Sequence, residues 1–218
     1  MSTRTHPAAG VPNNAQAGAD RSSGRLVLPA DSTELRESII RTARRLQEQR
    51  VLPGALGNFS VRLADGRFLV TPTSRDYRTM EPGDLAIVSA DGSVVHGPFP
   101  PSIEIGMHRA IYAARPDVGA VIHTHAPYAS TLAALGRPLP FLDELTRFSP
   151  GPVRVAAYGP AGSDELARNA VAALGGTNAV FLAMHGLIAV GPDLSAAEQV
   201  AEVIEHLAGV YLRALQSA

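Results

Sequence analysis

The stretch Val118-Gly119-Ala120-Val121-Ile122-His123-Thr124-His125 places two histidines at the end of an apolar run. The run predicts a buried strand, and side chains two apart on a strand point to the same face of the sheet. His123 and His125 can therefore hold one metal ion between them. A second apolar run, residues 179–184, leads into a third histidine, His185.

The set of donor atoms points to a catalytic metal rather than a structural one. Three histidines without cysteine are typical of a catalytic metal with an open coordination position, and the 218-residue chain contains no cysteine. Nitrogen donors and an open site favour zinc, with manganese, cobalt and nickel as alternatives. A pair of polar side chains that only hydrogen-bond to nearby loops is the structural alternative for His123 and His125.

Composition narrows the class of protein. Hydrophobic residues make up 45% of the chain and charged residues 18%, which fits one globular domain. The formal net charge of -1 argues against a nucleic-acid partner. The sequence has no apolar stretch of about 18 residues that would predict a membrane span, and no apolar signal segment follows Met1. A cytoplasmic location is therefore the default expectation.

Lysine is absent too, and all 19 basic side chains are arginine. Schiff-base chemistry needs a lysine amine, so composition excludes a lysine-dependent aldolase and a pyridoxal-phosphate enzyme. A phosphate-binding loop of the lysine-bearing type is excluded for the same reason.

Hydrophobic periodicity and capping residues predict alternating helices and strands. Residues 1–28, rich in Ala, Gly, Pro, Asn and Ser, predict a disordered leader, and residues 29–218 predict a single domain. Helices are expected to begin at Asp31 and end before Pro53, to cover 102–114, 127–135 and 163–174, and to run from the cap Ser195 to about 215. Strands are expected at 58–63, 68–71, 85–88, 118–123, 153–157, 179–184 and 187–190.

The connections between these elements are short, which favours hairpins over uniform crossover helices. The expected fold class is therefore α/β, a three-layer α/β/α sandwich with a mixed, mostly antiparallel central sheet.

Glu104 is the candidate acid/base. It lies in Pro100-Pro101-Ser102-Ile103-Glu104, where prolines define the entry to a helix. Because lysine and cysteine are missing, a partly desolvated carboxylate is the available proton carrier beside a metal-bound substrate. A first-turn glutamate that only favours the helix dipole is the alternative. His108 lies four residues on, on the same helical face, and is expected to pack in the core or to orient Glu104.

Three turns are candidate sites for an anionic or polar group of a substrate: Gly57-Asn58-Phe59-Ser60, Thr71-Pro72-Thr73-Ser74 and Pro101-Ser102. Backbone N–H groups and short polar side chains at such turns can bind an anion without lysine, although ordinary turn chemistry also explains each turn alone. The candidate substrate-binding residues are Asn58, Thr73, Ser74 and Ser102.

In their order along the chain, these motifs resemble those of the class II aldolase/adducin family. Residues 54–62 are similar to the family's Gly-Thr-x-Gly-Asn-x-Ser-x-Arg, residues 71–74 to Thr-Pro-Ser/Thr-Gly, and residues 101–104 to Pro-Ser-Ser-Glu. Residues 115–128 resemble Arg-Pro-Asp followed by Val-x-His-x-His-Ser-Pro-Tyr, and residues 184–187 resemble Asn-His-Gly-Leu. The resemblance covers roughly residues 35–215.

The resemblance implies a zinc-dependent carbon–carbon lyase, an aldolase that cleaves or forms a small hydroxy-ketone such as a sugar phosphate through a metal-stabilised enediolate. It implies that His123, His125 and His185 are the zinc ligands and that Glu104 is the acid/base. It also implies a homotetramer with sites at subunit interfaces. There Tyr211, on the last helix, would reach a neighbouring subunit's site as a proton donor.

The sequence departs from the family pattern at the expected phosphate pocket. Ile103 replaces a serine, Ser74 replaces a glycine, and Asp143 and Glu144 stand near the place of a family tyrosine. A decarboxylase is the first alternative, because it needs the same metal site and less phosphate recognition. Epimerases and dehydratases of the family are further alternatives. A non-catalytic, adducin-like interaction protein is a third class, against which the three retained histidines and Glu104 argue.

Overall fold

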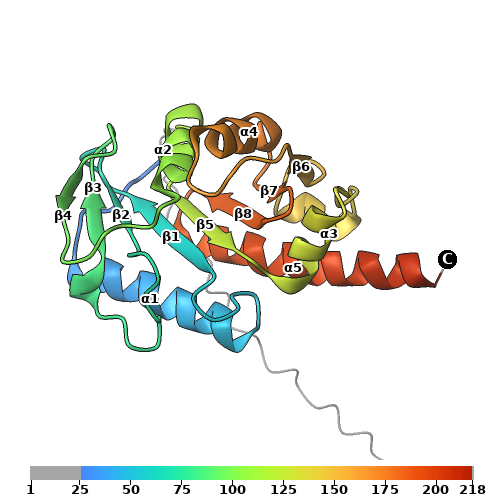
Figure 1. Ribbon diagram of the computed structural model, residues 1–218, viewed down its shortest axis with the longest axis horizontal. Coiled ribbons are helices and arrows are strands. Elements are labelled where there is room, and N and C mark those ends of the chain that lie inside the picture. Colours follow the sequence, from blue (N-terminus) through green and yellow to red (C-terminus); the bar gives the residue numbers. More distant parts are fainter. Residues whose placement is uncertain (1–25, 218) are drawn as a thin grey trace, which may run out of the picture.

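In the computed structural model, which describes residues 26–217, eight strands form one mixed sheet in the order β4-β3-β2-β1-β5-β8-β7-β6 (Figure 1). The pair β6 and β7 is parallel, and the other neighbouring strands are antiparallel. The strands are β1 (Gly57–Arg62), β2 (Phe68–Val70), β3 (Ala86–Val88), β4 (Val94–His96), β5 (Ala120–Thr124), β6 (Arg154–Ala156), β7 (Ala179–Leu182) and β8 (Gly186–Gly191).

Helices cover both faces of the sheet. Figure 1 shows α2 and α4 on one face and α1 and α5 on the other, where α3 also packs against α5. The predicted three-layer α/β/α sandwich is confirmed. The helices are α1 (Thr33–Glu48), α2 (Ile105–Ala114), α3 (Pro127–Ala134), α4 (Asp164–Leu174) and α5 (Leu194–Gln216), with short 3-10 helices η1 (Pro82–Asp84) and η2 (Asp143–Arg147).

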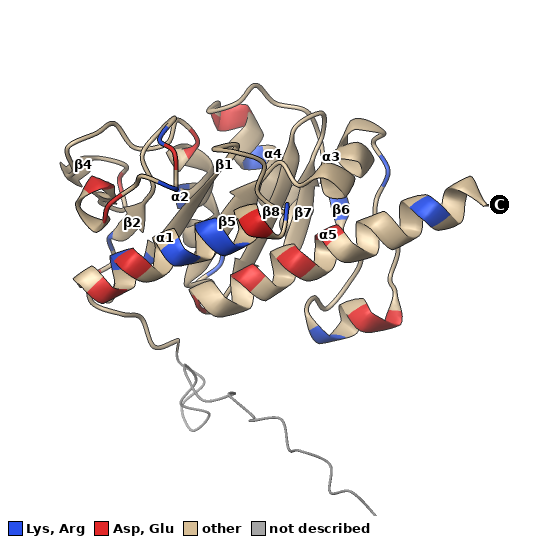
Figure 2. Ribbon diagram, turned by 90° about the horizontal axis from the view of Figure 1, so that it is seen from below, with Lys and Arg blue, Asp and Glu red and all other residues tan. Residues whose placement is uncertain are grey.

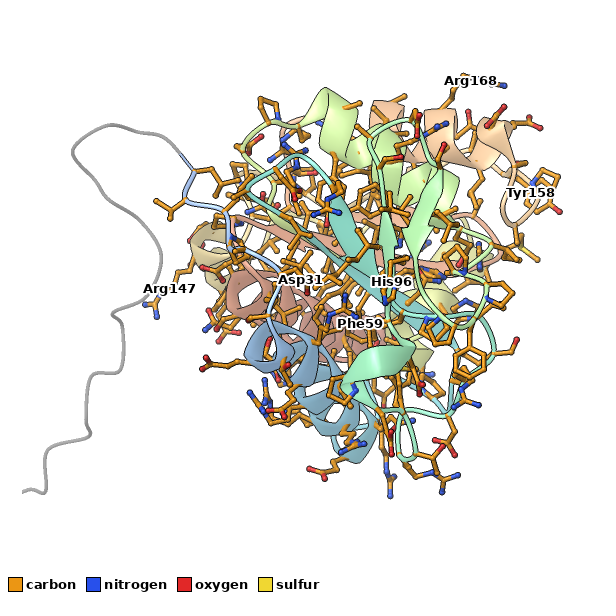
Figure 3. The ribbon with its side chains drawn as sticks, turned by 90° about the vertical axis from the view of Figure 1, so that its left-hand side faces the viewer. Asp31, Phe59, His96, Arg147, Tyr158 and Arg168 are labelled. Atoms are coloured by element: carbon orange, nitrogen blue, oxygen red, sulfur yellow. The ribbon has the colours of Figure 1, made fainter. Side chains whose placement is uncertain are left out.

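Alternation along the central strands divides the core into two layers. On β5, Ala120 and Ile122 pack in the layer that contains α1, α3 and α5, whereas Val121 packs in the layer that contains α2 and α4. His123 lies two residues after Val121 and therefore faces α2. Figure 3 shows Phe59 of β1 inside the molecule and Arg147, Tyr158 and Arg168 at its periphery.

Two helix starts differ from the sequence prediction. Ser32 caps α1 by accepting a hydrogen bond from the Leu35 N–H at 3.1 Å, because Asp31 is held by Arg36, with 2.7 Å between Asp31 Oδ1 and Arg36 Nε. Asp193, rather than Ser195, caps α5 by accepting from the Ala196 N–H at 2.8 Å. Ser163 caps α4 as predicted.

Ser102 precedes α2 in a turn, and the helix itself starts at Ile105. The strand β4 was not predicted, because its three residues are all exposed and show no apolar alternation. Residues 1–25 of the predicted leader lie outside the described residues.

Helices α1 and α5 run side by side and carry many of the charged residues on this side of the molecule (Figure 2). Arg45 of α1 joins them through Glu198 of α5, with 2.6 Å between Nη2 and Oε2. The carboxyl end of α5 projects beyond the sheet in both views. Across residues 26–217, none of the helices combines the length and apolar character needed to cross a membrane.

Candidate metal centre

Three histidines converge at one end of the central strands. His123 belongs to β5 and His125 follows it, whereas His185 lies in the turn between β7 and β8. The antiparallel pairing of β5 with β8 sets Thr124 opposite Leu187, which brings that turn beside the end of β5. The ring centroids lie 4.8 to 4.9 Å apart in each pair, and one ring nitrogen of each histidine lies within 4.8 Å of the other two.

Hydrogen bonding and burial prepare His123 to act as a ligand. Its Nδ1–H donates to the carbonyl oxygen of Leu187 at 3.0 Å, which leaves the Nε2 lone pair facing His125 Nε2 at 3.1 Å. A hydrogen bond of this kind sets the tautomer and ring orientation of a metal-ligating histidine. Burial, together with the neighbouring His185 and His125, holds the pKa of His123 well below its usual range. Burial also lowers the pKa of His125.

Gly186 is needed for the close approach of the three rings. A Cβ atom at this position would lie 2.6 Å from the carbonyl oxygen of Thr124 and 3.2 Å from His123 Cε1. Any larger residue would push the β7–β8 turn away from β5. Met184, directly before His185, has a left-handed backbone, with φ of 60°.

Glu104 faces the histidines from the start of α2. Its Oε2 lies 3.2 Å from His123 Nε2, and its Oε1 lies 3.4 Å from His185 Nε2. The side chain is only 7% exposed. Asn58, on β1, donates to Oε2 through Nδ2–H at 2.8 Å, whereas Oε1 is buried and has no hydrogen-bond partner in the described part of the chain.

These residues fit a divalent transition-metal ion. Neutral imidazoles are the form that ligates a metal, and one ring nitrogen of each histidine lies within 4.8 Å of the other two. The unpartnered Glu104 Oε1 faces the same space. A cation, or a water or hydroxyl group bound to one, would satisfy this buried oxygen.

Two of the predicted anion-binding turns are joined to each other. The Thr73 N–H donates to the carbonyl oxygen of Pro100 at 3.1 Å, and the Ser102 N–H donates to that of Thr71 at 3.2 Å. The hydroxyl of Ser102 accepts from the Glu104 N–H at 3.2 Å. Ser74 has φ of 54°, the left-handed conformation that glycine adopts most easily.

The third turn joins the same group through its own contacts. The Phe59 N–H donates to Thr71 Oγ1 at 3.1 Å, which ties β1 to the second turn. The Asn58 side chain contacts Glu104 through Nδ2 and His108 through Oδ1. The structure therefore places Asn58 and Ser102 in contact with Glu104 and links the turn of Thr73 and Ser74 to the segment that precedes Ser102. Contact of these four residues with a substrate stays a prediction.

His108 is completely buried, as its expected packing position requires. Packing alone was too limited a description, because both of its ring nitrogens have side-chain partners, Asn58 Oδ1 at 2.6 Å and Ser60 Oγ at 2.7 Å. The spacing of four residues from Glu104 was the signal in the sequence. The partners come from a distant strand, so no local pattern identified them.

Tyr211 and the acidic pair lie elsewhere in this chain. Tyr211 packs at the edge of the core layer formed with α1, α3 and α5, and its helix ends in the projecting segment of α5. Asp143 and Glu144 belong to η2. Glu144 lines a surface pocket with Arg147, Phe148, Glu202, Val203 and His206. Within residues 26–217, this pocket includes none of the three histidines.

The fold is a three-layer sandwich, and it carries a candidate three-histidine metal centre beside a buried carboxylate. Residues 37–212 match the family model described as class II aldolase and adducin N-terminal domain. The chain belongs to the class II aldolase/adducin family.

Individual relatives agree with this assignment. A protein of Rhodospirillum rubrum named 5-methylthioribulose-1-phosphate/5-deoxyribulose-1-phosphate aldolase is 41% identical over 192 residues, covering 88% of this chain and 86% of that protein. A 5-deoxy-D-ribulose 1-phosphate aldolase of Bacillus thuringiensis is 37% identical, covering 81% and 83%.

A solved structure of an L-fuculose 1-phosphate aldolase superposes with a TM-score of 0.84 at 34% identity, covering 87% of this chain and 90% of that one. The sequence motifs alone favoured L-fuculose-1-phosphate aldolase as the nearest type within the family. The higher identity to the Rhodospirillum rubrum protein corrects that preference.

Proposed function

We propose that this chain is a zinc-dependent aldolase that cleaves a ketose 1-phosphate into two smaller carbonyl compounds and can catalyse the reverse reaction. The observation that carries the proposal is the meeting of His123, His125 and His185 with the unpartnered Oε1 of Glu104. The aldolase names of the relatives support the reaction type.

Each part of the site has a role in this proposal. When bound, a divalent cation supplies Lewis acidity at the substrate's carbonyl and adjacent hydroxyl oxygens. Glu104, held through Oε2, moves a proton with Oε1 at the carbon next to the carbonyl. The joined turns that contain Thr73, Ser74 and Ser102 hold the phosphate through N–H and hydroxyl groups.

A tail of the substrate without a hydroxyl group fits the rim of the site. Three large apolar residues lie next to site residues. Ile103 and Met184 directly precede Glu104 and His185 in the chain, and the carbonyl of Leu56 accepts from the His125 N–H. Leu56, Ile103 and Met184 are 54%, 64% and 70% exposed. The two relatives are named for 5-deoxy or 5-methylthio sugars, whose C5 groups lack a hydroxyl. The proposed substrate is therefore a ketose 1-phosphate with an apolar C5 substituent.

The reaction is tested by product identity. Purified, zinc-loaded protein is incubated with 5-deoxyribulose 1-phosphate, 5-methylthioribulose 1-phosphate and fuculose 1-phosphate, and dihydroxyacetone phosphate and aldehyde release are measured. Cleavage of the first two with a preference of roughly 10-fold or more over fuculose 1-phosphate is expected. Ile103→Ser should reduce this preference. Carbon dioxide release from a sugar acid, without aldehyde, would favour the decarboxylase alternative instead.

The role of Glu104 is tested by Glu104→Gln, which preserves the size of the side chain. We expect the variant to retain zinc and to lose activity by a factor of about 100 or more, the usual scale for a positioned acid/base. A nearly normal rate would remove Glu104 from proton transfer. Absence of stoichiometric metal in the unaltered protein would favour the adducin-like alternative.

We also infer that the site is completed between subunits of a homotetramer, with Tyr211 donating a proton to the aldehyde oxygen in the synthetic direction. The projecting end of α5 supports this assignment, because a helix that leaves its own domain can reach another. Glu104→Gln and Tyr211→Phe are each expected to be impaired. Co-expression of the two variants should restore activity, because some sites then receive an intact Glu104 from one subunit and an intact Tyr211 from the next. Failure to restore activity would place Tyr211 in its own subunit's site or outside the mechanism.

A further inference from the structure

A continuous ladder of buried side chains leads away from the candidate acid/base. Its contacts are Glu104 Oε2 to Asn58 Nδ2 at 2.8 Å, Asn58 Oδ1 to His108 Nε2 at 2.6 Å, His108 Nδ1 to Ser60 Oγ at 2.7 Å, and Ser60 Oγ to Tyr112 OH at 2.8 Å. All five residues are less than 9% exposed.

The ladder arises because a helix and a strand match in spacing. Glu104, His108 and Tyr112 follow one another at intervals of four residues along α2 and its cap, which is about 6 Å of rise. Asn58 and Ser60 are two residues apart on one face of β1, which is about 6.6 Å. The side chains of the helix and the strand can therefore alternate, and each polar group meets the next one.

The hydrogen atoms in this ladder run in one direction. An ionised Glu104 can only accept, so the amide NH₂ of Asn58 faces it and the amide oxygen faces His108. That oxygen also can only accept, so His108 carries its proton on Nε2. The bare Nδ1 then accepts from the Ser60 hydroxyl, and the Ser60 oxygen accepts from the Tyr112 hydroxyl.

The neutral state of His108 is compatible with this direction, which the contact with Glu104 determines. Burial lowers the pKa of His108 to about 3, with a further lowering by His123 that outweighs the opposing effect of Glu104. At neutral pH the ring therefore has one donor and one acceptor nitrogen. Rotation of the Asn58 amide by half a turn would set acceptor against acceptor at Glu104, and it would set donor against donor at His108 for as long as the ring proton stays on Nε2.

We propose that His108 is a positioning residue that, through Asn58, holds one oxygen of Glu104 and leaves the other free for proton transfer with the substrate. The inference rests on the proposed aldolase function. It follows from the contrast between the two oxygens: Oε2 accepts a hydrogen bond from Asn58, whereas Oε1 has no hydrogen-bond partner within residues 26–217 and lies 3.4 Å from His185 Nε2. With His108 altered, the amide and the carboxylate can rotate together, and Oε1 spends less time in its reactive position.

The first test compares two substitutions of His108 in zinc-loaded protein. His108→Leu removes both polar contacts, whereas His108→Gln can return an amide N–H near the position of Nε2. We expect His108→Leu to lower kcat roughly 10- to 100-fold, the usual range for residues that orient site groups. KM and zinc content should stay nearly unchanged, and His108→Gln should recover much of kcat.

Thr42→Val is the matched control. Thr42 is also buried and its hydroxyl bonds to Glu198 Oε2 at 3.2 Å, but it lies on α1, across the sheet from Glu104. It should lower the midpoint of thermal unfolding without changing kcat per bound zinc. If His108→Leu behaves in the same way, or if His108→Gln is no better than His108→Leu, the proposal is wrong.

The second test does not depend on activity. Nitrogen-15 NMR of the imidazole in the full chain, with and without zinc, reports which nitrogen of His108 carries hydrogen. We expect the Nε2–H tautomer in the unaltered protein and in Glu104→Gln. An Nδ1–H tautomer in the unaltered protein would reverse the ladder and overturn the proposal. If the tautomer is as expected but no ketose phosphate is cleaved, the proposed function fails while the arrangement of the ladder stands.

Discussion

Met184 holds a left-handed backbone directly before a candidate metal ligand, with φ of 60°. A residue with a Cβ atom in this conformation costs roughly 1–2 kcal/mol relative to the right-handed region, and asparagine tolerates it better than most. Because 70% of the Met184 side chain is exposed, little buried surface offsets this cost. The related motif Asn-His-Gly-Leu has asparagine at this place, which now has a backbone explanation.

Met184→Asn should therefore stabilise the metal-free protein by about 0.5–1 kcal/mol, measured by urea unfolding. Met184→Gln is the control, because it is polar but has no comparable preference for the left-handed region. If Met184→Gln stabilises the protein equally, side-chain polarity and not the backbone is responsible.

His125, which follows β5, is the histidine chosen to test the proposed ligand set. Within residues 26–217, its ring has no carbonyl partner like the one that holds His123. His125→Ala should abolish stoichiometric zinc binding and turnover while the fold persists, because only a half-buried side chain is removed. Metal analysis after gel filtration and far-ultraviolet circular dichroism measure the two effects. Retained zinc with full activity would contradict the assignment.

At the level of single residues, the sequence predicts which histidines meet better than it predicts the residues around them. His-x-His after an apolar run and a histidine after a second run indicate one site, because strand periodicity determines which side chains share a face. The contact between Asn58 and His108 spans 50 residues. It depends on how α2 docks on β1, which no local pattern encodes.

At the level of elements, a charged residue of α5 completes the start of α3. Glu205 Oε1 and Oε2 accept from the N–H groups of Tyr128 and Ala129 at 2.9 and 2.8 Å. These are two of the N–H groups that a helix leaves unpaired in its first turn. The Ala126 position before the helix offers no side-chain cap, so α5 supplies one from a distance.

Glu205→Ala should destabilise the protein by about 1–2 kcal/mol, because the buried N–H groups lose their acceptors. Urea unfolding is the measurement, with Glu202→Ala as the control on the same helix. Burial raises the pKa of Glu205, although the two N–H groups oppose the shift. If removal of the carboxylate leaves stability unchanged, the burial cost of the charge equals the gain from the cap.

Element boundaries show why sequence patterns go only part of the way. The apolar runs of β5, β7 and β8 are predicted within two residues, because these central strands are buried on both faces. The edge strand β4 is not, because its residues are exposed. Asp31 was the expected cap of α1, but its pairing with Arg36 leaves Ser32 to cap the helix.

At the level of the whole molecule, buried neutral histidines make the stability of the metal-free protein sensitive to acid. The pKa of His108 is about 3 when folded, compared with 6.5 for an unperturbed histidine. The unfolded chain therefore binds more protons below pH 6.5, and stability falls as pH decreases. His123 acts in the same direction. The raised pKa of Glu205 acts in the opposite direction.

His108 alone should remove about 2 kcal/mol of stability between pH 7 and pH 5, since one proton of difference corresponds to about 1.4 kcal/mol per pH unit. Urea unfolding at a series of pH values, with chelator present, measures how the free energy of unfolding changes with pH. In His108→Gln, the loss of stability between pH 7 and pH 5 should be smaller by nearly the whole contribution of His108. A slope that is the same in both proteins would mean that folding does not lower the pKa of His108.

The central place of β5 in the sheet determines how its amide hydrogens exchange with solvent. The amide hydrogens of β5 bond to β1 on one side and to β8 on the other, so they exchange with deuterium only when the centre of the sheet opens cooperatively. The outer strands β4 and β6 can open separately. The imidazole-bearing strand thus belongs to the slowest-opening part of the domain. A bound ion would be released on the timescale of global unfolding or by direct dissociation, and not by loosening of the sheet's margins.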